Sequence, residues 1–192
     1  IVIAFRHDKH TVVDEIIEHQ LTRAHLLGRM DKHIALSHIG EQYLHLKRGV
    51  YIAHSPESNM NLASGVAPVN QFIDRGLHVG LATDVAGGSH ESMLKAMMHA
   101  IQASKLRWRL LDQNVKPLSF ERAFYLATMG GGQFFGKVGS FLDGYELDAV
   151  VLDDESLEHP QQLSPRARLE RMVYLADERN ICAKFVSGRK IL

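Results

Sequence analysis

The chain has 192 residues, of which 45% are hydrophobic, so it can bury a substantial core as one large domain or two small ones. Its lysines and arginines number 22, as do its aspartates and glutamates, and the formal net charge is zero. This balance argues against nucleic acid or an anionic membrane as a partner, because either would require a basic surplus on one face.

The sequence also bears on the compartment. A single cysteine, Cys182, excludes a disulfide within the chain and favours a reducing environment. The sequence contains no run of about 18 apolar residues and no secretory signal pattern at its start, which favours a soluble cytoplasmic protein. Because residues 1–5 read as a buried strand with nothing before it, we expect the chain to be part of a larger polypeptide.

Strands and helices alternate through the first two thirds of the chain. Short apolar segments predict strands, and apolar positions three and four residues apart predict helices. The expected elements, in order, are a strand at 1–5, a helix at 11–27, a strand at 34–39, a short helix at 41–47, a strand at 50–53, a helix at 67–75, a strand at 77–83 and helices at 91–106 and 119–128. Repeated strand–helix units predict an α/β fold with the last four strands of a TIM-like (β/α)8 barrel, because each parallel return needs a crossover helix.

The tail of the chain follows another pattern. Strand-like segments at 149–153 and 183–192 are separated by a polar stretch with a helix near 165–174. We therefore expect residues 1–142 to form the C-terminal half of a barrel. Residues 143–192 are expected to add a small accessory β-layer with an intervening helix.

Asp84 carries the strongest chemical signal in the sequence. An apolar strand delivers this carboxylate to its C-terminal tip, and two glycines follow, as where α/β barrels present metal ligands and acid–base groups. The plainer interpretation is that Asp84 caps the next helix. His38 and His54 at neighbouring strand ends favour a functional site. A carboxylate suits zinc or iron and can also move a proton from a water that the metal activates.

Three histidines at strand ends each have two interpretations. His38 either is buried against the backbone or polarises an attacking water, a task that suits a pKa near neutrality. His54 either takes part in the site or braces the polar loop after it. His7 is the right type of residue for a further metal ligand, although a solvated lead-in to the next helix explains it equally well.

Other polar features have simpler structural explanations. Ser58 or Asn59 could orient a ligand, but the capping of a turn explains them better. The glycines at 130–132 resemble a fragment of a phosphate loop, yet no Lys-Ser/Thr pair follows them, so a glycine-rich helix terminus is the better interpretation. The methionine-rich face of the helix at 91–106 predicts core packing. Eight further histidines are expected to be structural: His19, His25, His33, His45, His78, His90, His99 and His159.

Longer motifs are similar to those of a known family. His54-Ser-Pro-Glu-Ser-Asn-Met-Asn-Leu-Ala-Ser-Gly-Val-Ala-Pro68 and Gly80-Leu-Ala-Thr-Asp84-Val-Ala-Gly-Gly88 resemble the seventh- and eighth-strand signatures of amidohydrolase-superfamily deaminases. Four further segments resemble the guanine deaminase branch of this family more than its adenosine-type relatives. They are 85–94, 132–141, 144–151 and 169–181.

The resemblance implies a barrel with a β-sandwich built from both chain ends. It also implies zinc-dependent hydrolysis of guanine to xanthine and ammonia, with one zinc per subunit and iron as the alternative metal. Asp84 would be a zinc ligand that relays protons, His38 would contact the water and the substrate, and His7 would match the fifth-strand ligand. The implied partners are a small purine and a second copy of the chain in a homodimer.

Two departures from the family pattern leave alternatives open. The family's His-x-His pair of zinc ligands does not occur in the chain. The family's fifth strand ends His-x-x-Glu, whereas His10 stands where that proton-shuttling glutamate would be. The alternatives are a sister deaminase acting on another aminopurine, a pterin or an adenosine derivative, and a non-catalytic homologue that binds a purine or a protein partner.

Overall fold

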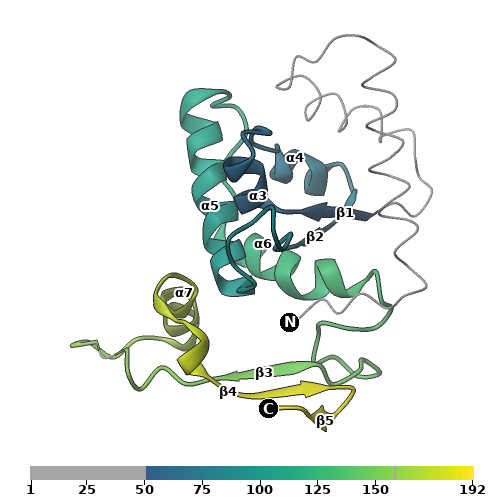
Figure 1. Ribbon diagram of the computed structural model, residues 1–192, viewed down its shortest axis with the longest axis vertical. Coiled ribbons are helices and arrows are strands. Elements are labelled where there is room, and N and C mark those ends of the chain that lie inside the picture. The colour runs from purple at the N-terminus through teal and green to yellow at the C-terminus, as the bar shows by residue number, and fades with distance from the viewer. Residues whose placement is uncertain (1–50, 158) are drawn as a thin grey trace.

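The computed structural model describes residues 51–157 and 159–192 (Figure 1). The strands and helices expected within residues 1–50 lie outside this part of the chain. The described residues form an α/β unit followed by a small antiparallel sheet, which lies toward the lower end of the molecule in Figure 1.

Two parallel strands lie at the centre of the α/β unit. β1 (Tyr51–His54) pairs in parallel with β2 (His78–Leu81), and His54 lies opposite Leu81. The last three residues of β2 are buried, as expected where helices cover a parallel sheet. Both expected strands are confirmed, and their parallel pairing brings their C-terminal ends to the same edge.

The connection between these strands contains two short helices. α4 (Val69–Asp74) confirms the helix expected there. α3 (Pro56–Asn61) corrects the interpretation of the segment after β1 as a polar loop. Pro56 occupies the first helical turn, where its fixed φ and missing N–H favour helix initiation, and Leu62 N donates to Ser58 O at 2.9 Å.

The helices after β2 begin at serine caps. Ser92 Oγ accepts from Lys95 N at the start of α5 (Met93–Leu110), which extends four residues further than expected. Ser119 caps α6 (Phe120–Tyr125) in the same way. The last three residues of that expected helix instead begin a π-helical segment, η2 (Leu126–Gly130).

Glycines allow η2 to pack closely against β2. A Cβ added to Gly80 would lie 2.6 Å from Gly131 Cα, and one added to Gly130 would lie 2.5 Å from Val79 O. The structural interpretation of the glycines at 130–132 is therefore confirmed, because they bring a helix terminus against a strand.

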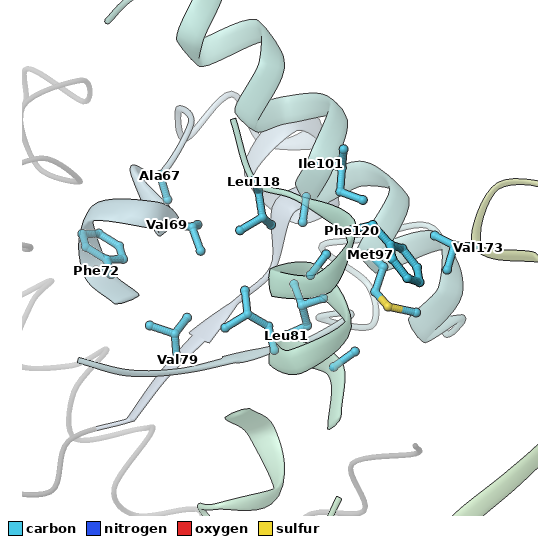
Figure 2. Packing of buried hydrophobic residues seen from close by; sticks show 14 residues of the cluster. Ala67, Val69, Phe72, Val79, Leu81, Met97, Ile101, Leu118, Phe120 and Val173 are labelled. Atoms are coloured by element: carbon cyan, nitrogen blue, oxygen red, sulfur yellow. The ribbon is translucent and has the colours of Figure 1, made fainter. Parts of the chain in front are cut away.

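One apolar cluster joins these elements (Figure 2). Leu81 of β2 and Leu126 of η2 are fully buried within it. Met97 lies in the cluster on α5, which confirms core packing for the methionine-rich face. Val173 of α7 (Pro165–Leu175) lies beside Met97, so the tail helix packs against the α/β unit. The division of the chain at residue 142 stays a prediction.

The tail forms a three-stranded antiparallel sheet. Its strands β3 (Ala149–Leu152), β4 (Ile181–Val186) and β5 (Arg189–Lys190) lie in chain order, and the 3₁₀ turn η3 (Glu178–Asn180) leads into β4. The strands β3 and β4 lie where strand-like segments are expected, and their role as an accessory β-layer stays a prediction. None of the helices in the described part of the chain has the length and apolar character needed to cross a bilayer.

Candidate active site

Asp84 lies on a strained turn at the C-terminal edge of the strand pair. Asp84 and Ala86 have φ angles of 52° and 80°, values that non-glycine residues rarely adopt. The amides of Gly87 and Gly88 both donate to Asp84 O, at 3.0 Å and 2.6 Å. Such strain persists only where the surroundings hold it, and it concentrates at functional sites. Because Ser92 caps α5, the capping interpretation of Asp84 is wrong.

The short helix α3 lies against this turn. A Cβ added to Gly87 would stand 2.6 Å from Ser58 Oγ and 2.7 Å from Asp84 Oδ2, so the buried Ser58 hydroxyl and the Asp84 carboxylate converge on the same point. Asn61 Nδ2 donates to Gly87 O at 2.8 Å. Capping of a turn is therefore not the whole account of Ser58, because its hydroxyl lies beside the carboxylate of the candidate ligand Asp84.

A group of four polar residues, here called the Glu57 cluster (Glu57, Ser89, His90 and His99), links three elements. The Ser89 hydroxyl donates to Glu57 Oε1. His90 Nε2 lies 3.8 Å from the same oxygen, and His99 Nδ1 lies 3.9 Å from Glu57 Oε2. The two imidazole rings are stacked with centroids 6.4 Å apart.

The environment of Glu57 favours its charged form. Burial raises the pKa of this carboxyl, but hydrogen bonds from Ser89 and the charges of His99 and His90 outweigh burial, so the pKa lies below its usual value. Sequence reasoning missed Glu57, because its partners come from α5 and from the turn after β2. Only the fold brings these segments together.

His54, at the end of β1, is 6% exposed. Burial lowers its pKa from 6.5 to about 4, so the imidazole is neutral at neutral pH. Its backbone carbonyl accepts from Ala82 N at 2.9 Å, which ties the ends of the two strands together. A neutral imidazole is not charged to act as an acid at neutral pH, and the bracing role of its side chain stays a prediction.

Asp84 is the candidate zinc ligand that lies within the described residues. The Asp84 carboxylate is exposed on its turn, and its oxygens are ligands that zinc accepts. Within residues 51–157 and 159–192, no three His, Cys, Asp or Glu side chains come together as a metal site. His7 and His38 lie outside the described residues, so both the His7 ligand and the cleft shared by Asp84 and His38 stay predictions.

Comparison with known proteins assigns the chain to a family. The model of the amidohydrolase family matches residues 6–191 of the chain. The chain therefore belongs to the amidohydrolase family, and its α/β fold is of the TIM-barrel type.

Within that family the chain is similar to purine deaminases. Guanine deaminase of Homo sapiens is 35% identical over 158 residues, which cover 76% of this chain and 34% of that protein. The crystal structure of guanine deaminase from C. acetobutylicum, with guanine bound in its active site, is 44% identical with a TM-score of 0.70, and the match covers 74% of this chain and 34% of that one. An adenosine deaminase from Xanthomonas campestris with bound zinc is 26% identical with a TM-score of 0.65, over 79% of this chain and 34% of that one.

The chain thus spans about a third of the length of the curated relatives that it matches.

Proposed function

We propose that the whole protein hydrolyses guanine to xanthine and ammonia with the help of zinc. The observation that carries the proposal is the position of Asp84, on a strained turn at the C-terminal edge of two parallel strands. Barrel enzymes place their chemistry at this edge. The 44% identity to a guanine deaminase with bound guanine supports guanine as the substrate.

Each candidate residue has a role in this reaction. Asp84 would hold the metal through its carboxylate and move a proton between the attacking water and the leaving amine. His38 would contact that water and the substrate, and His7 would be a further metal ligand. When bound, zinc lowers the pKa of water and thereby supplies a nucleophile at neutral pH. The remaining ligands would come from outside the described residues.

The proposal extends to the architecture and assembly. We place β1 and β2 as the last two strands of an eight-stranded barrel, since they are parallel and joined through helices. The antiparallel sheet of β3, β4 and β5 would belong to an accessory β-sandwich. One zinc per subunit, with iron as the alternative metal, a homodimer and a cytoplasmic location complete the proposal.

A sister deaminase is the second candidate. The similarity to an adenosine deaminase with bound zinc favours it, because the same fold then serves another aminopurine. Both candidates share the role of Asp84. They differ only in the substrate.

Substrate profiling of the whole protein tests the proposal. Ammonia release would be measured with guanine, adenosine and an amino-substituted pterin, and the zinc content would be measured by elemental analysis. Turnover of guanine with about one zinc per subunit is the expected result. Turnover of adenosine-type substrates alone would replace guanine by the sister activity, and a protein without zinc and without turnover would leave only the binding homologue.

A further inference from the structure

We infer that Glu57 is a positioning residue that, with its neighbours on α3, holds the Asp84 turn and so directs the Asp84 carboxylate. The inference rests on the proposed function to the extent that Asp84 serves the metal and the proton transfer. Glu57 itself takes no part in the chemistry.

The first argument is that two side chains of α3 reach neighbouring residues of the turn. Asn61 Nδ2 donates to Gly87 O, and the Ser89 hydroxyl donates to Glu57. Glu57 and Asn61 are four residues apart, so they lie on the same face of the helix. Glu57 Oε2 also lies 3.3 Å from the Cβ position of Gly88. The helix therefore holds residues 87 and 89 by two hydrogen bonds, and the Glu57 carboxylate lies beside Gly88 between them.

The second argument is that these contacts continue to Asp84. The amide of Gly88, beside the Glu57 carboxylate, donates to Asp84 O at 2.6 Å. With φ angles of 52° at Asp84 and 80° at Ala86, the turn is strained and needs support from outside itself. Glu57, which is bonded to Ser89 and lies beside Gly88, provides part of that support.

The third argument is electrostatic. The Glu57 side chain is only 15% exposed, and a carboxylate in such a place is unfavourable unless it is paired. Its partners come from the continuation of the turn (Ser89 and His90) and from α5 (His99). Within the described part of the chain, His99 Nδ1 is buried without a hydrogen bond, and the acidic group facing it is Glu57. The Glu57 carboxylate, itself on α3, thus has partners on the turn and on α5.

The test compares Glu57→Leu and Glu57→Gln with the matched control Glu91→Gln in the whole protein. Glu91 is exposed at the end of the same loop and lies outside the Glu57 cluster. Three quantities would be measured: hydrogen exchange of the amides at 87–89, zinc affinity by chelator competition, and kcat and KM for guanine. Thermal unfolding would report whether each variant keeps its fold.

For Glu57→Leu we expect turn amides that exchange at least about 10-fold faster. Zinc affinity and kcat should each fall by about 10- to 100-fold, the usual effect of losing a residue that orients a ligand. KM should stay within about threefold, because substrate contacts remain. Glu57→Gln should lie between Glu57→Leu and the control, since it keeps an acceptor for Ser89 but not the charge.

The inference is overturned if turn exchange and zinc affinity in Glu57→Leu equal those of Glu91→Gln. If Glu57→Leu loses its fold, Ser89→Ala takes its place, and unchanged exchange at 87–88 in that variant overturns the inference. Failure of the proposed function has another signature, a wild-type protein that deaminates no guanine. The exchange measurement needs neither metal nor activity, so it decides the role of Glu57 in that case too.

Discussion

Ser58 Oγ and Asp84 Oδ2 approach the same position beside Gly87, at 2.6 Å and 2.7 Å from where a Cβ of that residue would stand. Gly87 does not have a positive φ, so its backbone conformation suits alanine. An alanine there would instead clash with the two neighbouring side chains. Gly87→Ala should push the Asp84 carboxylate aside. Because a displacement of about 1 Å can reduce a rate by about 100-fold, we expect kcat to fall by at least about 10-fold.

Gly136→Ala is the control for Gly87→Ala. Gly136 has a φ of 110° in open space, so alanine there should reduce stability by about 1 to 3 kcal/mol through backbone strain but leave kcat unchanged. Steady-state kinetics and thermal unfolding of both variants separate the two effects. Equal kcat values for both variants would show that the space beside Gly87 has no bearing on Asp84.

Replacement of Asp84 by asparagine tests the proposed ligand and proton carrier. Asparagine has the same size and tolerates positive φ, so the turn should keep its conformation. The variant lacks the charge and the titratable proton, and we expect kcat to fall by about 10²- to 10⁴-fold and zinc to be lost. Ammonia release and elemental analysis measure both quantities.

Asp143→Asn removes the same charge at an exposed position and should behave like the wild type. If Asp84→Asn retains both zinc and turnover, Asp84 is neither the ligand nor the proton carrier.

Much of the site's framework could be predicted because its signals are local. β2 is an apolar segment that ends before Asp84 and two glycines, and this order places a carboxylate at a strand tip. The packing of Met97 followed in the same way from helical spacing. Predictions of this kind require only neighbours along the chain.

The rest of the site depends on contacts between distant segments. α3 is too short and polar to show a hydrophobic period, and its contacts with the turn after β2 exist only once β1 and β2 pair. Glu57 could not be singled out for the same reason, since Ser89 follows it by 32 residues. The π-helical η2 packs against β2 where Gly131 comes close to Gly80, a contact between distant segments that no local propensity records.

Core packing gives a prediction about stability. Leu126 is 0% exposed at the start of η2, within the apolar cluster of Figure 2, whereas Leu110 at the end of α5 is 73% exposed. Leu126→Ala should reduce the free energy of unfolding by about 2 to 5 kcal/mol, because it removes buried atoms and leaves a cavity. Leu110→Ala should change it by no more than about 0.5 kcal/mol. Urea denaturation of the two variants measures the difference, and similar midpoints would contradict the position of Leu126 in the core.

Buried His54 predicts a specific loss of stability in acid. Its pKa is about 4 in the folded protein, against an ordinary value of 6.5. Between these values the unfolded chain binds a proton that the folded chain does not, so stability is complete above the unfolded pKa and falls as the pH decreases toward the folded pKa. The shift corresponds to roughly 3 kcal/mol for this group.

His54→Gln removes the titrating group, so the difference in unfolding free energy between about pH 7 and about pH 4.5 should shrink by a few kcal/mol relative to the wild type. His159→Gln, at an exposed site, should keep the wild-type difference. Urea denaturation at both pH values measures it, and an unchanged pH dependence in His54→Gln would mean that His54 is not buried in its neutral form.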